Sequence, residues 1–187
     1  IFRRTTVQSQ NINVSGGTDI AKYRFSAGYF DNGSTRGNYN YTRYNFKSST
    51  EFKIGKHLVI GNNTMYRYTK TTGRDADIGG ALRWAPYQPV LSNASKNPGH
   101  YSNITNADNL NDAVNPMIPL AFNKDNGFDN KLLTQLYAEV KIIEGLTFHS
   151  QFQYEFDSYR YLNYLEKDYI NSVSNANYLN EGYSVGM

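Results

Sequence analysis

The feature that most constrains this chain is a period-two alternation of apolar and polar side chains. It is clearest in residues 146–156, LTFHSQFQYEF, where Phe148, Phe152 and Phe156 share one side and His149 and Glu155 share the other. Successive side chains of an extended strand point to opposite faces, so this pattern predicts a strand with one apolar and one polar face. The stretch KYRFSAGYF, residues 22–30, alternates in the same way.

The same reasoning predicts about six strands, each bounded by turn residues. They are expected at about residues 6–15, 22–30, 41–52, 57–70, 131–142 and 146–156. The first strand is only weakly marked by apolar residues. In the fourth it is ambiguous which side is apolar, because Asn62 and Thr64 are expected on the same side as Leu58 and Tyr66. Helical periodicity is hard to find. The fold class predicted is therefore all-β and antiparallel.

The predicted connections alternate between short and long. Short turns are expected at GGTDI, KIGK and IEG, whereas the second connection is longer and the fourth runs from about residue 71 to 130. Consecutive antiparallel strands place alternate connections at opposite ends of a sheet. One end of the sheet therefore carries short turns and the other carries long loops. This asymmetry is typical of outer-membrane β-barrels, which have short periplasmic turns and long extracellular loops.

Composition limits the alternatives. The mean hydropathy is −0.65 and no run approaches the roughly 20 apolar residues that a membrane-spanning helix needs. Tyrosine is abundant, with 17 copies, which suits a surface having both wet and apolar sides. The formal charge of +3 is too small to indicate nucleic-acid binding, and the absence of cysteine excludes a disulfide framework or thiolate metal site.

Two environments fit the alternation. In a membrane only a closed barrel satisfies the backbone of spanning strands, and its outside is apolar while its lumen is polar. The side chains expected to line such a lumen are Lys22, Arg24, Arg43, Lys47, His149, Gln151, Gln153 and Glu155. In a soluble sandwich the polar side would simply face water, so the strands alone leave both readings open.

Several motifs together resemble the barrel of the SusC/RagA group of TonB-dependent outer-membrane transporters of Bacteroidetes. They are Val14-Ser15-Gly16-Gly17, Lys22-Tyr23, Ser26-Ala27-Gly28-Tyr29-Phe30, Arg43-Tyr44-Asn45-Phe46, Ala81-Leu82-Arg83, Pro86, Pro89-Val90, Gly99, Tyr101, Asn115-Pro116 and Gly145-Leu146. Each motif is weak by itself, whereas their order and spacing over nearly the whole chain are fairly specific.

The resemblance implies a 22-stranded barrel with an N-terminal plug domain in the bacterial outer membrane. It implies import of glycans, oligosaccharides or peptides with a SusD-like surface lipoprotein as lid and a TonB–ExbB–ExbD complex as energy source. About six strands cannot close such a barrel. Residues 1–187 are therefore interpreted as a barrel segment without the plug. The alternative is a small independent barrel or sandwich that acts as a carbohydrate-binding or adhesin module.

The long connection is where ligand contacts are expected, because barrel function concentrates in elaborated loops. Trp84, with Arg83, Tyr87 and Tyr101, is a candidate surface for stacking on and hydrogen bonding to a sugar or peptide. Alternatively, the stretch RWAPYQP packs the loop against the barrel rim. For Arg83 the packing role is favoured, and for Trp84 both roles stay open.

Other sites find little support in the sequence. The stretch NKDNGFDN resembles a calcium loop only faintly, lacks the closing glutamate and is better explained as an Asx-Gly turn. His149, His57 and His100 show no zinc spacing, and no metal or cofactor is expected. No catalytic motif is present, so an enzyme is not predicted. In residues 22–30 the basic side chains and the aromatic rings are expected on opposite faces of the strand. A nucleic-acid-binding groove needs both on one face, so this pattern argues against nucleic-acid binding.

Overall fold

The strands form one six-stranded antiparallel sheet in which each strand pairs with its neighbours in the sequence. The computed structural model describes residues 1–91, 101–102 and 115–165. The strands are β1 (Val7–Gly17), β2 (Ala21–Gly33), β3 (Asn40–Ile54), β4 (Leu58–Thr72), β5 (Asn123–Ile143) and β6 (Leu146–Leu165). The all-β, antiparallel architecture predicted from the alternation is confirmed.

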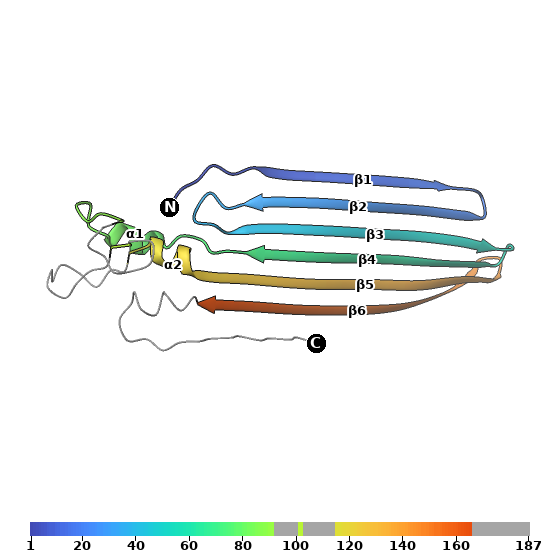
Figure 1. Ribbon diagram of the computed structural model, residues 1–187. Coiled ribbons are helices and arrows are strands. Elements are labelled where there is room, and N and C mark those ends of the chain that lie inside the picture. Colours follow the sequence, from blue (N-terminus) through green and yellow to red (C-terminus); the bar gives the residue numbers. More distant parts are fainter. Residues whose placement is uncertain (92–100, 103–114, 166–187) are drawn as a thin grey trace.

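Short turns gather at one end of the sheet and longer connections at the other (Figure 1). Residues 18–20, 55–57 and 144–145 make the short turns, and we call this the turn end. Residues 34–39 and 73–122 connect strands at the opposite end, the loop end. The predicted alternation of short and long connections is confirmed, and the long connection is shorter than the expected 71–130.

The difference arises because the strands extend further toward the loop end than the sequence pattern indicated. Residues 123–130, expected to form an Asx-Gly turn, instead begin β5. Residues 126–130 pair with residues 68–72 of β4 on one side, and residues 123–130 pair with residues 158–165 of β6 on the other. Backbone pairing on both sides therefore prevails over the turn propensity of Asn126 and Gly127. Likewise β6 continues to Leu165, beyond the expected end at about residue 156.

The register brings the apolar positions of all six strands onto one face, which we call the apolar face. Ile12, Ala27, Phe46, Tyr66, Leu132 and Phe156, for example, form one row across the sheet. The pairing also resolves β4, whose Leu58, Ile60, Tyr66 and Tyr68 lie on this face together with Asn62 and Thr64. The ambiguity in the sequence reflected two polar positions within an otherwise apolar stripe.

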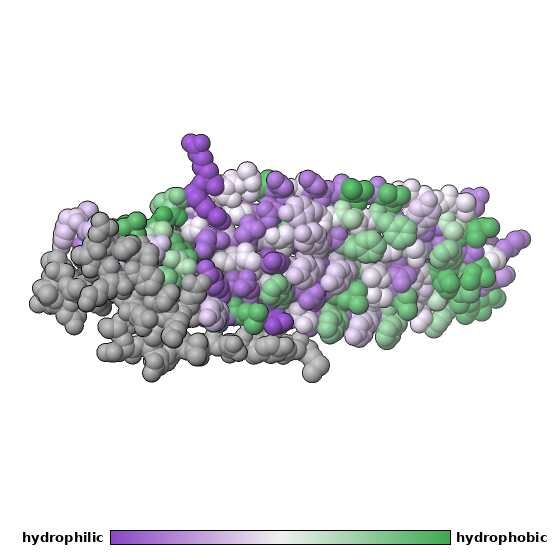
Figure 2. Space-filling view, viewed as in Figure 1, coloured by the Kyte–Doolittle hydropathy of each residue, from purple (hydrophilic) through white to green (hydrophobic). Residues whose placement is uncertain are grey.

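The apolar face is not covered by a second layer in the part of the chain that the structure describes. The exposed apolar side chains on it include Ile12, Val14, Tyr23, Phe25, Phe46, Phe52, Ile54, Leu136, Phe148, Phe152 and Phe156. In Figure 2 hydrophobic side chains gather toward the turn end, and hydrophilic ones are concentrated nearer the loop end. Among the described residues, the buried hydrophobic side chains all lie in the long connection: Ala76, Trp84, Ile118, Leu120 and Phe122.

Two short helices, α1 (Ile78–Arg83) and α2 (Met117–Phe122), lie within the long connection beyond the strand ends (Figure 1). Asp77 caps α1, since its Oδ1 accepts a hydrogen bond of 2.9 Å from the backbone N–H of Gly80. Ile118 of α2 is fully buried and Leu120 nearly so. The apolar side chains of α2 are therefore buried at the loop end. None of the described helices is long and apolar enough to cross a membrane.

Candidate functional site

The apolar face is a band that ends at a row of tyrosines on its loop-end side. At the loop end of the band, Tyr29, Tyr44 and Tyr68 form a row on neighbouring strands, which we call the tyrosine row. Ring centroids in this row are 5.3 Å apart for Tyr29 and Tyr44 and 6.2 Å apart for Tyr44 and Tyr68. Tyrosines at such a border place an apolar ring on one side and a hydroxyl on the other, as at a lipid–water interface.

The length of the apolar band along one strand can be compared with the thickness of a bilayer interior. On β3 it extends from Tyr44 to Ile54. Ten steps at a rise of ~3.3 Å give ~33 Å along the strand. A tilt of about 40°, common in membrane barrels, reduces this to ~25 Å, which is also the typical height of the outward apolar band.

Charges on this face are confined to its loop-end rim. Within the described strands the charged residues on it are Asp31, Lys70, Lys124 and Arg160, and all lie beyond the tyrosine row. From the tyrosine row to the turn end the face carries hydroxyl, amide and apolar side chains only. The opposite face, which we call the polar face, carries the remaining charges of the strands.

The eight side chains predicted to line a lumen share the polar face. They are Lys22, Arg24, Arg43, Lys47, His149, Gln151, Gln153 and Glu155. Four of them border two adjoining hollows in the half of the sheet nearer the turn end. Lys22 and Arg24 line a hollow of about 690 Å³ with Glu51 and Tyr137, and Arg24, Lys47 and Gln153 line one of about 290 Å³.

Ion pairs link neighbouring strands across the polar face. Lys22 Nζ lies 3.8 Å from Glu51 Oε1, and Tyr137 donates a hydrogen bond of 3.1 Å to Glu51 Oε2. Arg67 pairs with Asp129 at 3.0 Å. Most of these side chains are substantially exposed, so each pair contributes little to stability. The face is therefore best described as a hydrated, charged surface rather than a packed core.

The C-terminal strands continue this pattern. Lys131 lies between two carboxylates, forming a close ion pair with Glu155 and another of 3.6 Å with Asp157. His149 Nδ1 lies 3.2 Å from Glu139 Oε1, and both side chains are exposed. Glu155 and Asp157, which share the polar face of β6, are thus two carboxylates held around one lysine.

Arg43 occupies a more enclosed position near the loop end. Its guanidinium carbon lies 5.3 Å from the centre of the Phe30 ring, within the range of a cation–π contact. Phe30 in turn packs edge-on against Tyr41, with centroids 6.0 Å apart. The sequence predicted that Arg43 shares a face with the lumen candidates, whereas its stacking on Phe30 depends on the pairing of β2 with β3.

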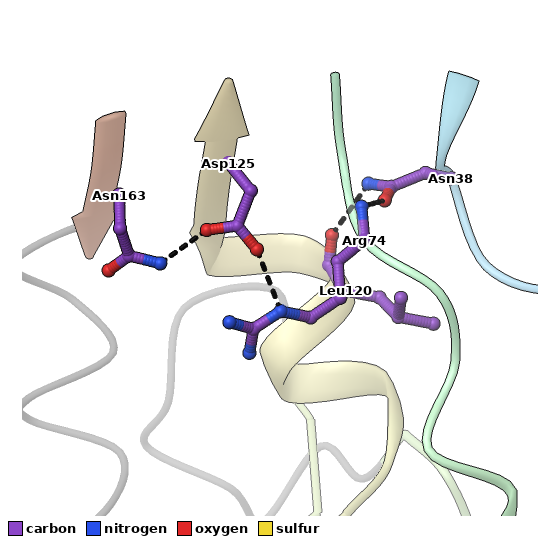
Figure 3. A network of polar contacts seen from close by, with 5 residues as sticks. All are labelled: Asn38, Arg74, Leu120, Asp125 and Asn163. Atoms are coloured by element: carbon purple, nitrogen blue, oxygen red, sulfur yellow. Dashed lines mark hydrogen bonds and ion pairs between the residues drawn. The ribbon is translucent and has the colours of Figure 1, made fainter. Parts of the chain in front are cut away.

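A polar network fastens the long connection to the strands (Figure 3). Arg74 Nε donates a hydrogen bond of 2.8 Å to Asp125 Oδ2, and Asn163 Nδ2 donates to the other carboxylate oxygen. Asn38 Oδ1 accepts from the backbone N–H of Arg74 at 2.7 Å, and Asn38 Nδ2 donates to the Leu120 carbonyl at 3.0 Å. The network joins the second connection, the start and end of the long one, and β6. It therefore holds the loop end in one arrangement.

The same end of the sheet carries a second ion pair. Arg36 lies 3.2 Å from Asp75, linking the second connection to the long one. Partial burial, with a further contribution from the Asp75 carboxylate, raises the pKa of the Tyr39 phenol above its ordinary value. Tyr39 therefore stays a neutral hydrogen-bonding group throughout the physiological pH range.

The four loop residues proposed to contact a ligand do not form one surface. Trp84 is 9% exposed, and its Nε1 donates a hydrogen bond of 3.1 Å to the Gln88 carbonyl. Tyr101 packs edge-on against Phe122, with ring centroids 5.9 Å apart. Tyr87 is 67% exposed, and Arg83 is exposed at the end of α1. The structure favours the packing role for Trp84 and leaves Tyr87 as the accessible ring.

Asn115 is a structural residue that sequence reasoning missed. It is fully buried, and its Nδ2 donates to the carbonyls of Val90 and Ser102 at 2.9 and 3.0 Å. Its Oδ1 accepts from the backbone N–H of Met117 at 3.1 Å, at the start of α2. The Asn115-Pro116 dipeptide drew attention in the sequence only through the family resemblance. A buried asparagine serving three backbone groups explains the position physically.

The remaining candidates are resolved in part. His57 lies in the turn before β4, as expected, with its Nδ1 3.2 Å from the Lys141 carbonyl. His100, Asp108 and Asp112 lie outside the described residues. Among the residues that are described, no group of three or more His, Asp or Glu side chains could hold a metal ion.

Comparison with known proteins adds no assignment. No protein-family model matches the chain. No curated protein is significantly similar to it.

Proposed function

We propose that residues 7–165 form part of the wall of an outer-membrane β-barrel, with the apolar face toward lipid and the polar face toward the lumen. The observation that carries this proposal is the uncovered apolar band, which is continuous across all six strands and which would be ~25 Å high at the strand tilt common in membrane barrels. A face of this kind in water would expose many large side chains, each worth about 1.5–3 kcal/mol when fully buried. Lipid removes that cost without a second protein layer.

The edges of the sheet also support the proposal of a barrel wall. In the described part of the chain β1 and β6 each have a strand on one side only. Long edge strands leave unpaired backbone groups that template aggregation in water and are not tolerated in hydrocarbon. Further strands pairing with both edges, as in a larger closed barrel, would satisfy these groups. The sheet is thus suited to be one sector of a large barrel.

Within that barrel, we propose a role in TonB-dependent import of oligomeric nutrients, either glycans and oligosaccharides or peptides. The support is the resemblance of the motifs at residues 14–30, 43–46, 81–90 and 145–146 to SusC/RagA transporters, together with the loop asymmetry. A SusD-like lipoprotein would cover the loop end, and a TonB–ExbB–ExbD complex would supply energy. The wet, charged polar face provides a surface along which a hydrated substrate can pass.

The lipid assignment is tested by fluorescent labels on two adjacent residues that face opposite ways. Phe46 lies on the apolar face and Lys47 on the polar face, and residues 1–187 contain no cysteine. Single cysteines at these positions in the full-length protein are labelled with an environment-sensitive dye in lipid vesicles. We expect nitroxide-bearing lipids to quench the label at 46, and a water-soluble quencher to reach only the label at 47.

Two results would contradict the assignment. A label at 46 shielded from both quenchers would indicate the core of a soluble sandwich, as in the carbohydrate-binding alternative. Equal aqueous quenching at 46 and 47 would indicate that both faces are in water. Retention of the β-sheet circular dichroism spectrum by both labelled variants is the control.

The transport role is tested by uptake in cells that express the full-length protein. Fluorescent pools of oligosaccharides and of peptides are offered to cells with and without the gene. We expect one pool to accumulate only when the gene is present and to stop accumulating when the proton gradient is collapsed. Uptake that persists without the gradient would contradict TonB-dependent import while leaving the barrel assignment intact.

A further inference from the structure

Two cations on the polar face lack the ionic partners that its carboxylates have. Every carboxylate that the described strands place on this face lies beside a basic side chain: Glu51 beside Lys22, Asp125 beside Arg74, Asp129 beside Arg67, Glu139 beside His149, and Glu155 and Asp157 beside Lys131. By contrast, the exposed side chains of Arg24 and Lys47 form no ion pair or hydrogen bond with the residues that the structure describes. The described strands therefore present unpaired cations, but no unpaired carboxylate, on the polar face.

Arg24 and Lys47 are close enough to act together. Arg24 on β2 pairs with Ser49 on β3, and Lys47 precedes Ser49 by two positions, so it lies on the same face. The two cations are therefore diagonal neighbours on adjacent strands. Diagonal neighbours in an antiparallel sheet are about 7–8 Å apart, a separation that long side chains can span. Their charged groups can thus converge on one anionic group of a ligand.

The smaller hollow on the polar face, of about 290 Å³, lies beside these cations. Its lining includes Arg24, Lys47, Ser49, Asn63, Gln135 and Gln153. Apart from the two cations, these side chains carry hydroxyl or amide groups, which both donate and accept hydrogen bonds. Met65 and Leu133 add a small apolar area to the lining. The combination fits a sugar ring with a carboxylate, because such a ring has hydroxyl groups at its edge and C–H groups on its faces.

The larger hollow, of about 690 Å³, adjoins the smaller one, since Arg24 and Ser49 line both. Tyr137 also lines it, and two contacts hold this ring in place. The Tyr137 hydroxyl donates a hydrogen bond of 3.1 Å to Glu51, and the ring lies against Gly61, where a Cβ would overlap it. Pockets for small ligands commonly measure ~300–1,000 Å³. The two hollows are therefore large enough for a short oligomer that passes Arg24.

We propose that these two hollows bind an acidic oligosaccharide, with the carboxylate of a uronic acid unit held between Arg24 and Lys47. Arginine would bind the carboxylate through two parallel N–H donors, and lysine would act as a point charge beside it. A neighbouring sugar unit would lie in the larger hollow against Tyr137. The neutral hydroxyl and amide lining favours a saccharide over an acidic peptide, because the hydroxyl groups of a sugar need partners that both donate and accept.

The inference rests on the proposed function, because it assigns the polar face to the lumen of an importer. It narrows the imported oligomers to saccharides that carry carboxylates. The charge of the ligand, rather than its size, is therefore the property to vary in a test.

The experiment measures binding to the full-length protein in detergent micelles by isothermal titration calorimetry. The probes are short oligomers of galacturonic, glucuronic and mannuronic acid, each compared with the same oligomer after reduction of its carboxyl groups to alcohols. We expect at least one acidic oligomer to bind about tenfold more tightly than its reduced form. Arg24→Gln and Lys47→Gln should each weaken binding of that acidic oligomer about fivefold and leave binding of the reduced form unchanged. The preference should also weaken as the ionic strength rises.

Lys53→Gln is the matched control, because Lys53 is an exposed cation on the same strand and the same face as Lys47 but lines neither hollow. We expect this variant to bind the acidic oligomer as the unmodified protein does. Equal loss from Lys53→Gln would indicate a general charge effect and overturn the assignment. Equal binding of the acidic and reduced forms of all the oligomers would also overturn it.

A peptide arm separates the two kinds of acidic oligomer. A glutamate oligopeptide of the same length should bind more weakly than the acidic saccharide, and tighter binding of the peptide would overturn the saccharide assignment. If the reduced and acidic oligomers bind equally while cells still take up a substrate pool that depends on the proton gradient, only this inference is rejected. Failure of the uptake experiment itself rejects the transport role.

Discussion

Replacement of Leu136 by arginine should lower the free energy of unfolding of the membrane-inserted protein by about 2–4 kcal/mol. Leu136 lies on the apolar face of β5, paired with Asn62 and Phe152, near the middle of the band. Its side chain is 47% exposed in the sheet, so arginine would not clash with a neighbouring layer. The expected loss arises because the guanidinium would be placed in hydrocarbon. The midpoint of denaturant unfolding in lipid vesicles measures it.

Gln135→Arg is the matched control, since Gln135 is the adjacent residue and lies on the polar face. We expect it to change the unfolding free energy by less than about 0.5 kcal/mol, as at an ordinary wet surface. Similar small effects for both variants would show that the apolar face is hydrated. That result would contradict the membrane assignment directly.

Replacement of Asn115 by leucine should lower the local stability of the long connection by about 3 kcal/mol. The variant keeps a similar volume but loses three hydrogen bonds, each worth about 1 kcal/mol. The Val90 carbonyl keeps its second hydrogen bond, from the backbone N–H of Ser102. Amide hydrogen exchange in α2 and around Val90 and Ser102 should accelerate by about two orders of magnitude. Exchange in the central strands β3 and β4 should stay unchanged, because Asn115 contacts only the connection.

Asn13→Leu serves as the control for Asn115, because Asn13 is exposed on β1. We expect no change in exchange at the loop end in this variant. Unchanged exchange around α2 in Asn115→Leu would contradict the role assigned to Asn115. Accelerated exchange throughout the sheet would contradict the separation of the loop core from the strands.

Much of the sheet was predictable because alternation is a local property of the backbone. The facing of Phe148, Phe152 and Phe156 follows from their spacing alone. Strand ends at the loop end were not predictable, because residues 123–130 are polar and carry turn-forming types. They form a strand only because they pair with the neighbouring strands β4 and β6. The side chains of Asp125 and Asp129 also form ion pairs with Arg74 and Arg67, respectively.

The loop site was less predictable than the strands. An isolated tryptophan beside prolines is compatible with both a ligand platform and a packed core, and its local sequence does not distinguish them. Trp84 is buried in the long connection, as are Ile118, Leu120 and Phe122, and its indole N–H donates to the Gln88 carbonyl. Asn115 carries no chemical motif, and its role appears only when Val90, Ser102 and Met117 are brought around it.

By itself, the sequence determined that the chain forms two-faced antiparallel strands with short turns at one end and long connections at the other, because period two and turn residues act locally. Only the tertiary structure decided which rows the side chains join. Strand register, a long-range property, collects the apolar positions into one uncovered band and places Tyr29, Tyr44 and Tyr68 in a row at its border.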